Sequence, residues 1–271
     1  MKIVIPPLRL CSSTVRYFRS KAALEALDAL DEQQQGSSLI LYNYPSFSGA
    51  FGALFAQLYH SHLQLPFLIL PFSQVLPFHS DDLTNLKNIH TCFLLDFIGP
   101  KGFVLTLSRF IPQVIAFDHR NSTLSRISSS EFQNCPNNLT LHIHTHVTSA
   151  RSAYNYFSEK LPSSSIPLLD HRKQPGVISI LQYLDDSDLR KFALPHAREF
   201  NVGLNEHRSK LNCLTNPYMF HQLLELDSSF LIAKVVSQAS CRCDAARKFL
   251  DKAFKVRLGR GLYGECLTRT R

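Results

Sequence analysis

Long apolar runs are missing from the sequence. None approaches the roughly 20 residues that a membrane-spanning helix needs, and prolines break the longest candidate, at 65–72. We therefore expect no span across a membrane and no membrane partner. Charged residues make up 18% of the chain and hydrophobic residues 45%, a balance that favours a compact fold and excludes a largely disordered chain.

The cysteines do not form the pattern of a disulfide framework. There are seven, an odd number at irregular positions, and no recognisable secretory signal precedes them. We therefore expect a reducing compartment, in the first place the cytoplasm. Cys241 and Cys243 are spaced to chelate a soft metal, but without a second such pair we interpret them as isolated thiols.

Acidic residues are absent before Glu25, where basic and hydroxyl side chains prevail. This composition is compatible with a transit peptide for a chloroplast or mitochondrion, although an amphipathic helix at 15–30 is the preferred interpretation. The formal charge of +8 favours an acidic partner, such as a nucleic acid or a phosphorylated metabolite. No aromatic ladder accompanies the basic residues, so a dedicated nucleic-acid surface is a lesser alternative.

Short apolar strands alternate with helical patterns along the chain. This alternation predicts an α/β fold, a doubly wound parallel sheet with helices on both faces, followed by a helical C-terminal segment. The expected units are an N-terminal helical or targeting segment (1–37), the α/β domain (38–210) and a helical linker with a basic tail (211–271). The predicted strands are 38–42, 67–72, 91–96, 114–118 and 139–147, and the predicted helices are 49–62, one from near Pro100, 148–161 and 176–192.

Polar residues follow three of these strands directly. Asn43, Asp96 and the pair Asp118-His119 stand at or just beyond strand ends, where chemistry gathers in parallel sheets. If the strands are neighbours, the side chains converge on one crevice. Taken alone, Asp96 is equally a cap for the helix near Pro100, but its convergence with Asp118 and His119 favours a present or former metal site.

Two further groups of polar residues have alternative interpretations. Strict alternation places His142, His144 and His146 on one face of a strand, but residues two apart are about 6.6–7 Å apart, so a straight row cannot surround one ion. We interpret them as a polar sheet face, with zinc binding as the lesser alternative. The acids at 185–188 either pair with Arg190 or Lys191 or reach the crevice.

Four segments together resemble the motifs of the DHH phosphoesterase superfamily, in particular its plant-type members. In order, they read ILYNYPSFSGAFGALFA, CFLLDFIGP, VIAFDHR and YLDDSDLRKFALP, and the likeness covers roughly residues 38–265. The resemblance implies a doubly wound α/β domain whose carboxylates and histidines hold two divalent ions, manganese or magnesium, for phosphoester hydrolysis. Anionic oxygens offset the repulsion between two such ions about 3.5–4 Å apart.

The resemblance also assigns roles to residues of this chain. It implies metal ligands at Asp96, Asp118, His119 and either Asp186 or Asp188, with Asp118 and His119 as the catalytic pair. Asn43 and Ser48 stand where the family has a histidine and an aspartate, and Arg120 replaces the second histidine of the third motif. These three become candidate phosphate ligands.

These departures weaken the metal site that the resemblance implies. A unit charge and a dication about 5 Å apart repel by roughly 6–7 kcal/mol at an effective dielectric of about 20, so Arg120 is suited to pair with Asp96 or Asp118, or to grip a phosphate. We therefore expect one ion or none.

The C-terminal end differs from the family as well. Active relatives continue into a DHH-associated domain with a glycine-rich loop, whereas this sequence contains no Gly-Gly pair, and its basic tail looks truncated. The preferred interpretation is a degenerate homologue with weak or no catalysis that binds a phosphorylated ligand or a partner protein. The alternatives are an active metal-dependent phosphodiesterase acting on short oligonucleotides or nucleotides, and a basic nucleic-acid-binding module. The oligomeric state is left open.

Overall fold

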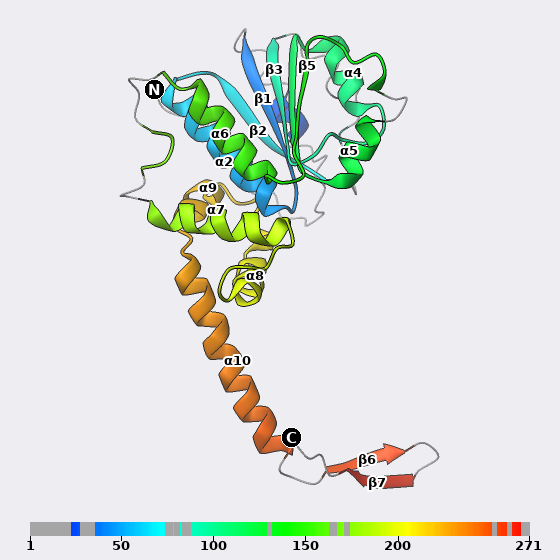
Figure 1. The fold of residues 1–271 in the computed structure, drawn as a ribbon, viewed down its shortest axis with the longest axis vertical. Coiled ribbons are helices and arrows are strands. Elements are labelled where there is room, and N and C mark those ends of the chain that lie inside the picture. Colours follow the sequence, from blue (N-terminus) through cyan, green and yellow to red (C-terminus); the bar gives the residue numbers. More distant parts are fainter. Residues whose placement is uncertain are drawn as a thin grey trace.

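A five-stranded parallel sheet forms the centre of the protein. The computed structural model describes residues 23–27, 36–73, 78, 82, 88–128, 132–162, 167–170, 174–250, 254–258 and 262–266. The strands lie in the order β2-β1-β3-β4-β5, and each pairs in parallel with its neighbours (Figure 1). They are β1 (Ser37–Asn43), β2 (Phe67–Phe72), β3 (Ile89–Leu95), β4 (Gln113–Asp118) and β5 (Leu139–Ile143).

Helices cover both faces of this sheet, which explains why the strands are apolar on both sides. In β1, Leu39 and Leu41 pack into one hydrophobic cluster, while Ile40 and Tyr42 pack into the other. Figure 1 shows α2 and α6 on one face, and α4 and α5 on the opposite face. The predicted α/β fold is therefore confirmed. The helices are α2 (Phe47–His62), α4 (Phe103–Phe110), α5 (Asn121–Ile127) and α6 (Ser149–Lys160).

The connection from β1 to α2 is unusually tight. Ser46 caps α2, because its side-chain oxygen accepts a hydrogen bond from the Gly49 amide at 3.3 Å. A Cβ atom on Gly49 would lie 2.5 Å from the backbone oxygen of Asn43, so only glycine permits this approach. The first turn of α2 is thereby held against the carboxyl end of β1.

The predicted elements differ from the structure at a few boundaries. β5 ends at Ile143, so the expected strand over 139–147 is too long, and a turn at 145–146 follows instead. Helix α5 was not predicted, because its sequence NSTLSRI is short and polar. The predicted helix at 176–192 is α7 (Pro175–Asp188), which begins with a proline in its first turn and ends before the positive φ of Arg190.

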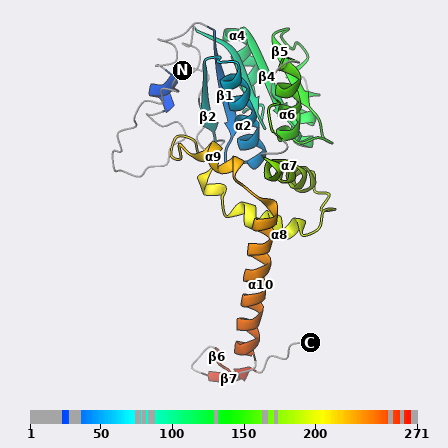
Figure 2. The same ribbon diagram turned by 90° about the vertical axis from the view of Figure 1, so that its left-hand side faces the viewer.

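The C-terminal part is mainly helical, as predicted. The helices α7, α8 and α9 lie beside one end of the sheet, and the long helix α10 extends away from them (Figure 2). Leu231 and Val235 anchor the start of α10 in the apolar interior. The antiparallel pair β6–β7 beyond it was not anticipated. These elements are α8 (Ala197–Asn205), the 3₁₀ helix η2 (Arg208–Lys210), α9 (Met219–Leu224), α10 (Ser228–Leu250), β6 (Phe254–Leu258) and β7 (Leu262–Cys266).

Within the described residues, no helix has the length and apolarity that crossing a membrane requires.

Candidate functional site

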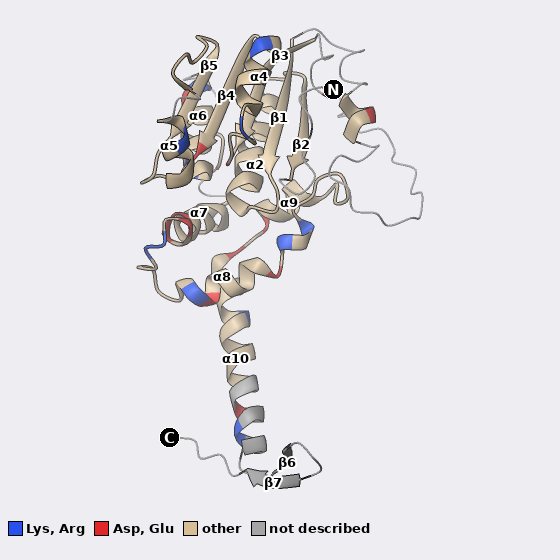
Figure 3. Cartoon of the chain, turned by 90° about the vertical axis from the view of Figure 1, so that its right-hand side faces the viewer, with Lys and Arg blue, Asp and Glu red and all other residues tan. Residues whose placement is uncertain are grey.

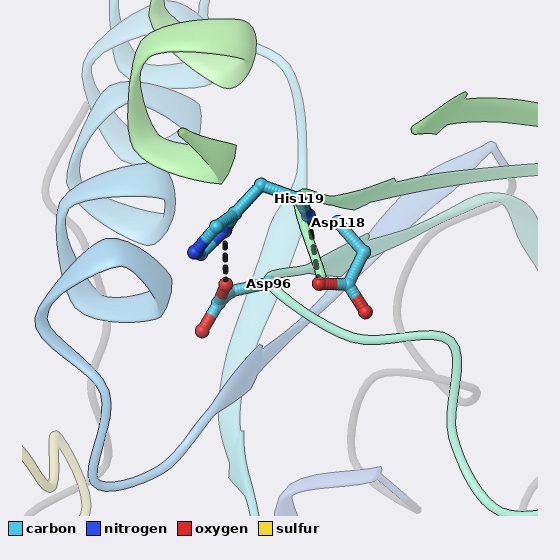
Figure 4. A group of neighbouring side chains, drawn as sticks. All are labelled: Asp96, Asp118 and His119. Atoms are coloured by element: carbon cyan, nitrogen blue, oxygen red, sulfur yellow. Dashed lines mark hydrogen bonds and ion pairs between the residues drawn. The ribbon is translucent and has the colours of Figure 1, made fainter. Parts of the chain in front are cut away.

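The candidate site lies where the direction of the sheet connections reverses. The chain leaves β1 for α2 on one face and leaves β3 for α4 on the other (Figure 1). In open α/β sheets this reversal opens a crevice at the carboxyl ends of the strands. Asn43, Asp96 and Asp118 stand at the ends of the adjacent strands β1, β3 and β4, as the sequence predicted. Figure 4 shows Asp96, Asp118 and His119 side by side.

Asp96 is buried and accepts hydrogen bonds at both carboxylate oxygens. Ser149 Oγ donates to Oδ1 at 2.8 Å, and Asn43 Nδ2 donates to Oδ2 at 3.0 Å. Its backbone has a φ of 69°, a left-handed conformation that aspartate tolerates better than most residues. Burial alone would raise the pKa of Asp96, but the hydrogen bond from His119 and the charges of Arg120 and His119 outweigh burial and hold that pKa well below its usual range.

Asp118, at the end of β4, is also buried, and both of its carboxylate oxygens accept hydrogen bonds. Its Oδ1 accepts from the amides of His119 at 2.8 Å and Arg120 at 3.3 Å, and its Oδ2 accepts from Thr123 Oγ1 at 2.6 Å. These contacts tie the end of the strand to the first turn of α5. Asp118 therefore supports the local backbone as well as contributing charge to the crevice.

His119 lies close to both Ser149 and Asp96. Its Nδ1 lies 2.8 Å from Ser149 Oγ and 3.3 Å from Asp96 Oδ1. Ser149 Oγ donates to Asp96, and the Ser149 amide points at the same Nδ1 at 3.4 Å, so the role of this ring nitrogen depends on the tautomer. Burial would lower the pKa of His119, but the hydrogen bond to Asp96 and the negative charges of Asp96, Asp188 and Asp118 raise it.

Arg120 lies between the two buried carboxylates. Its Nη2 is 3.1 Å from Asp96 Oδ2, and its Nε is 3.4 Å from Asp118 Oδ1. The same Nη2 donates to the backbone oxygen of Asp96. One third of the Arg120 side chain is exposed, at 33%, whereas the carboxylates are 3% and 1% exposed. We refer to Asp96, Asp118, His119 and Arg120 as the buried cluster.

Asp188 joins the edge of this site through Ser48. Ser48 is buried in the first turn of α2, and its Oγ donates to Asp188 Oδ2 at 2.5 Å. Asp188 is exposed by surface area, yet the protein around its carboxylate displaces water and raises its pKa, and the charges of Asp96 and Asp185 act in the same direction. Asp188 is thus the acid of α7 that faces the crevice.

The other two acids of α7, Asp185 and Asp186, contact groups outside the crevice. Both oxygens of Asp186 accept from backbone amides, those of Ala193 at 2.8 Å and Leu194 at 3.2 Å. Asp185 pairs with Arg151 Nε at 2.9 Å and accepts from Thr148 Oγ1. The structure therefore does not bring Asp186 into the crevice. Its assignment as a metal ligand stays a prediction that its observed contacts do not support.

The three histidines of the predicted strand do not share one face. His142 lies in β5 and stacks on Phe117, with ring centroids 4.8 Å apart and an interplanar angle of 9°. His144 and His146 follow the end of the strand and lie against each other, with centroids 5.8 Å apart. Among the described residues, these imidazoles do not form a group that could hold a metal ion.

A hollow of about 270 Å³ opens beside the buried cluster. It lies between the β1–α2 connection, the end of α7, and α8 with η2. Its polar lining consists of Asn43, Ser46, Asp188, Asn201, Asn205 and Arg208. Asn43 and Asp188 contact the cluster or its edge, so the hollow is continuous with the predicted crevice.

Sequence reasoning missed several residues of this region. Ser149 follows the β5 turn, and the rule on strand ends could have identified it. Thr123 lies on the unpredicted α5, and Asn201, Asn205 and Arg208 come from helices whose position relative to the sheet has no signal in the sequence.

The buried cluster does not fit a two-ion centre as it stands. Asp96, Asp118 and His119 offer one donor atom each within 4.8 Å of one another, which is a possible site for one ion. Two hard cations need more oxygen donors than these. Moreover, a guanidinium already lies between the two carboxylates, and their remaining oxygens accept from other donors.

Comparisons with known proteins give distant structural likenesses. Neither a protein-family model nor a curated protein sequence matches the chain. Among solved structures, the exonuclease RecJ bound to manganese is similar with a TM-score of 0.40 and 16% identity, over 90% of this chain and 69% of that chain. An exopolyphosphatase-related protein from Bacteroides fragilis is similar with a TM-score of 0.30 and 8% identity, over 86% of this chain and 61% of that chain. At these values the likenesses do not decide family or activity.

Proposed function

We propose that the chain is a DHH-type phosphoesterase homologue with weak or absent catalysis, in which the Arg120 guanidinium occupies the place of a divalent ion. The observation that carries this proposal is the position of Arg120, 3.1 Å from Asp96 and 3.4 Å from Asp118. The four sequence motifs that resemble the family supply the lineage. The contacts of Arg120 with both carboxylates support the proposed loss of catalysis.

Charge balance supports this proposal. The negative charges of Asp96 and Asp118 are offset by Arg120 and, when it is protonated, by His119. A dication about 5 Å from the guanidinium would be repelled by roughly 6–7 kcal/mol at an effective dielectric of about 20. Binding of a metal ion therefore requires Arg120 to leave both carboxylates.

The contacts of Asp118 and His119 also weaken the catalytic role that the resemblance implies for them. Both oxygens of Asp118 accept hydrogen bonds, and Nδ1 of His119 is held by Ser149. Asn43 and Ser48, which stand where the family has ligands, donate to Asp96 and Asp188. These hydrogen bonds stabilise the negative charges of Asp96 and Asp188, which a metal ion would otherwise neutralise.

We infer that the protein retains a phosphorylated small molecule as its ligand. The hollow beside the cluster is open, polar and lined by an arginine, all of which suit a small anion with hydroxyl groups. A general nucleic-acid surface is less favoured, because basic and acidic residues are interspersed along the described part of the chain (Figure 3). Binding of nucleic acid by charge would need basic side chains gathered along the phosphate backbone.

A hydrolysis assay tests the loss of catalysis. Short oligonucleotides and a nitrophenyl phosphodiester are incubated with the native chain and manganese, with the variant Asp96→Asn as the matched background. We expect equal rates, because the Arg120 guanidinium lies between the carboxylates that would hold an ion to activate water. A native rate well above that of Asp96→Asn would establish the active phosphodiesterase instead.

A further inference from the structure

The hollow contains a cation that no described residue neutralises. Arg208 lies on η2, is exposed, and has neither an ion pair nor a side-chain hydrogen bond with any described residue. Three other cations of this region are paired: Arg120 with Asp96 and Asp118, Arg151 with Asp185, and Lys234 with Glu206 at 2.6 Å. Arg208 is therefore available to a ligand in a way that Arg120 is not.

The rest of the polar lining offers mainly hydrogen-bond acceptors. The amide nitrogen of Asn43 donates to Asp96, and that of Asn201 donates to Ser187 Oγ and the Ala197 carbonyl. The side-chain oxygens of both asparagines accept no hydrogen bond from a described residue. Among the described residues, Asp188 accepts one hydrogen bond, from Ser48, so three of its lone-pair sites remain toward them. Several acceptors beside one free guanidinium match a ligand with several hydroxyl groups and one anionic group.

The size of the hollow limits the ligand. Its volume of about 270 Å³ lies just below the range of roughly 300–1,000 Å³ that is usual for sites of drug-sized ligands. Phe47 and Leu204 give it small apolar surfaces, against which the CH groups of a sugar ring can pack. A long nucleic-acid strand or a protein segment does not fit such a site.

We propose that the hollow binds a phosphorylated sugar, with Arg208 holding the phosphate and with Asp188, Asn43 and Asn201 accepting hydrogen bonds from the sugar hydroxyls. This inference rests on the proposed function, since it names the ligand class of the site beside the buried cluster. It differs from the sequence-based assignment, which gave the phosphate to Arg120, Ser48 and Asn43. A guanidinium binds phosphate with two parallel hydrogen bonds when no carboxylate competes for it.

Calorimetric titration of the full chain with ribose 5-phosphate tests this proposal. Ribose and inorganic phosphate serve as partial ligands, and each is expected to bind more weakly than ribose 5-phosphate. The variant Arg208→Gln is expected to weaken binding of ribose 5-phosphate about tenfold or more, because a hydrogen-bonded charge is lost. Lys210→Gln, which removes an exposed cation from the same η2 helix outside the hollow, is expected to change binding less than twofold.

The outcomes separate this inference from the proposed function. Ribose 5-phosphate that does not bind, or that binds equally to native chain and Arg208→Gln, overturns the inference. Binding of ribose as tight as that of ribose 5-phosphate also overturns the inference. A second variant, Asn201→Ala, is expected to weaken ribose 5-phosphate while leaving the affinity for inorganic phosphate unchanged. Manganese-dependent hydrolysis, by contrast, overturns the proposed function and leaves the titration result interpretable.

Discussion

The buried cluster and the hollow beside it differ in how their charges are paired. In the cluster, two carboxylates that are almost fully buried contact one guanidinium and one imidazole, and other polar groups complete their hydrogen bonds. In the hollow, Arg208 has no partner among the described residues, and Asp188 has only Ser48. The comparison indicates that a charge satisfied inside the protein maintains the fold, whereas an unsatisfied charge is available to a ligand.

Removal of Arg120 or of Arg208 is expected to give the largest difference in stability between the two regions. Arg120→Ala leaves Asp96 and Asp118 without their cation, and we expect it to lower the free energy of unfolding by about 3 kcal/mol. Arg208→Ala is the matched control, and we expect a change within about 0.5 kcal/mol, because its side chain is exposed and has no ion pair with a described residue. Urea denaturation of both variants measures the difference. Equal losses of stability for the two variants would contradict the account.

Asp186 and Asp188, near the end of α7, provide a smaller contrast. Asp186→Asn removes one of two oxygens that accept from the Ala193 and Leu194 amides, and we expect a loss of about 1–2 kcal/mol in the free energy of unfolding. Asp188→Asn keeps an acceptor for Ser48 and removes a charge that its surroundings disfavour, so we expect a change within about 0.5 kcal/mol. Thermal denaturation at neutral pH compares them, and the reverse order would show that the assignments are exchanged.

Two histidines separate the effect of burial from that of charge pairing. Burial lowers the pKa of His60, whose ring contacts the Ala56 carbonyl at 2.7 Å, although that hydrogen bond opposes the shift. In His119 the carboxylate of Asp96 reverses the effect of burial and raises the pKa. We expect NMR titration of the imidazole protons to place His60 below, and His119 above, the ordinary value of about 6.5.

The lowered pKa of His60 has a consequence for stability. Between the lowered pKa of folded His60 and its unfolded pKa of about 6.5, His60 binds a proton in the unfolded chain but not in the folded chain. The stability that is present above a pH of about 6.5 is therefore lost as the pH falls toward the folded pKa. The variant His60→Gln is expected to lose stability less steeply between neutral and mildly acidic pH, measured by denaturation at each pH. An unchanged slope would mean that His60 does not titrate with folding.

Much of the sheet could be predicted from local sequence pattern. Runs such as those of β1 and β4 are apolar on both sides because helices cover both faces, and strand ends identified Asn43, Asp96 and Asp118. The error in β5 came from extending an alternating pattern into a turn beyond Ile143. Alternation alone does not mark where backbone pairing stops, since β4 offers partners only as far as Asp118.

The pairing within the site was only partly predictable. The sequence suggested that Arg120 would contact Asp96 or Asp118, and it contacts both. The different roles of Asp186 and Asp188 depend on the course of the chain after α7, where the 193–194 amides return to Asp186. The proposed unit boundaries at 38–210 and 211–271, the plant-type affinity and the compartment stay predictions.

Manganese binding tests the central claim most directly. After dialysis against millimolar manganese, the metal content of the native chain is compared with that of the triple variant Arg120→His, Asn43→His and Ser48→Asp, which removes the cation and restores ligands. The account predicts no stoichiometric manganese in the native chain and bound manganese in the variant. One or more equivalents in the native chain would contradict it, because the guanidinium would then not exclude the ion.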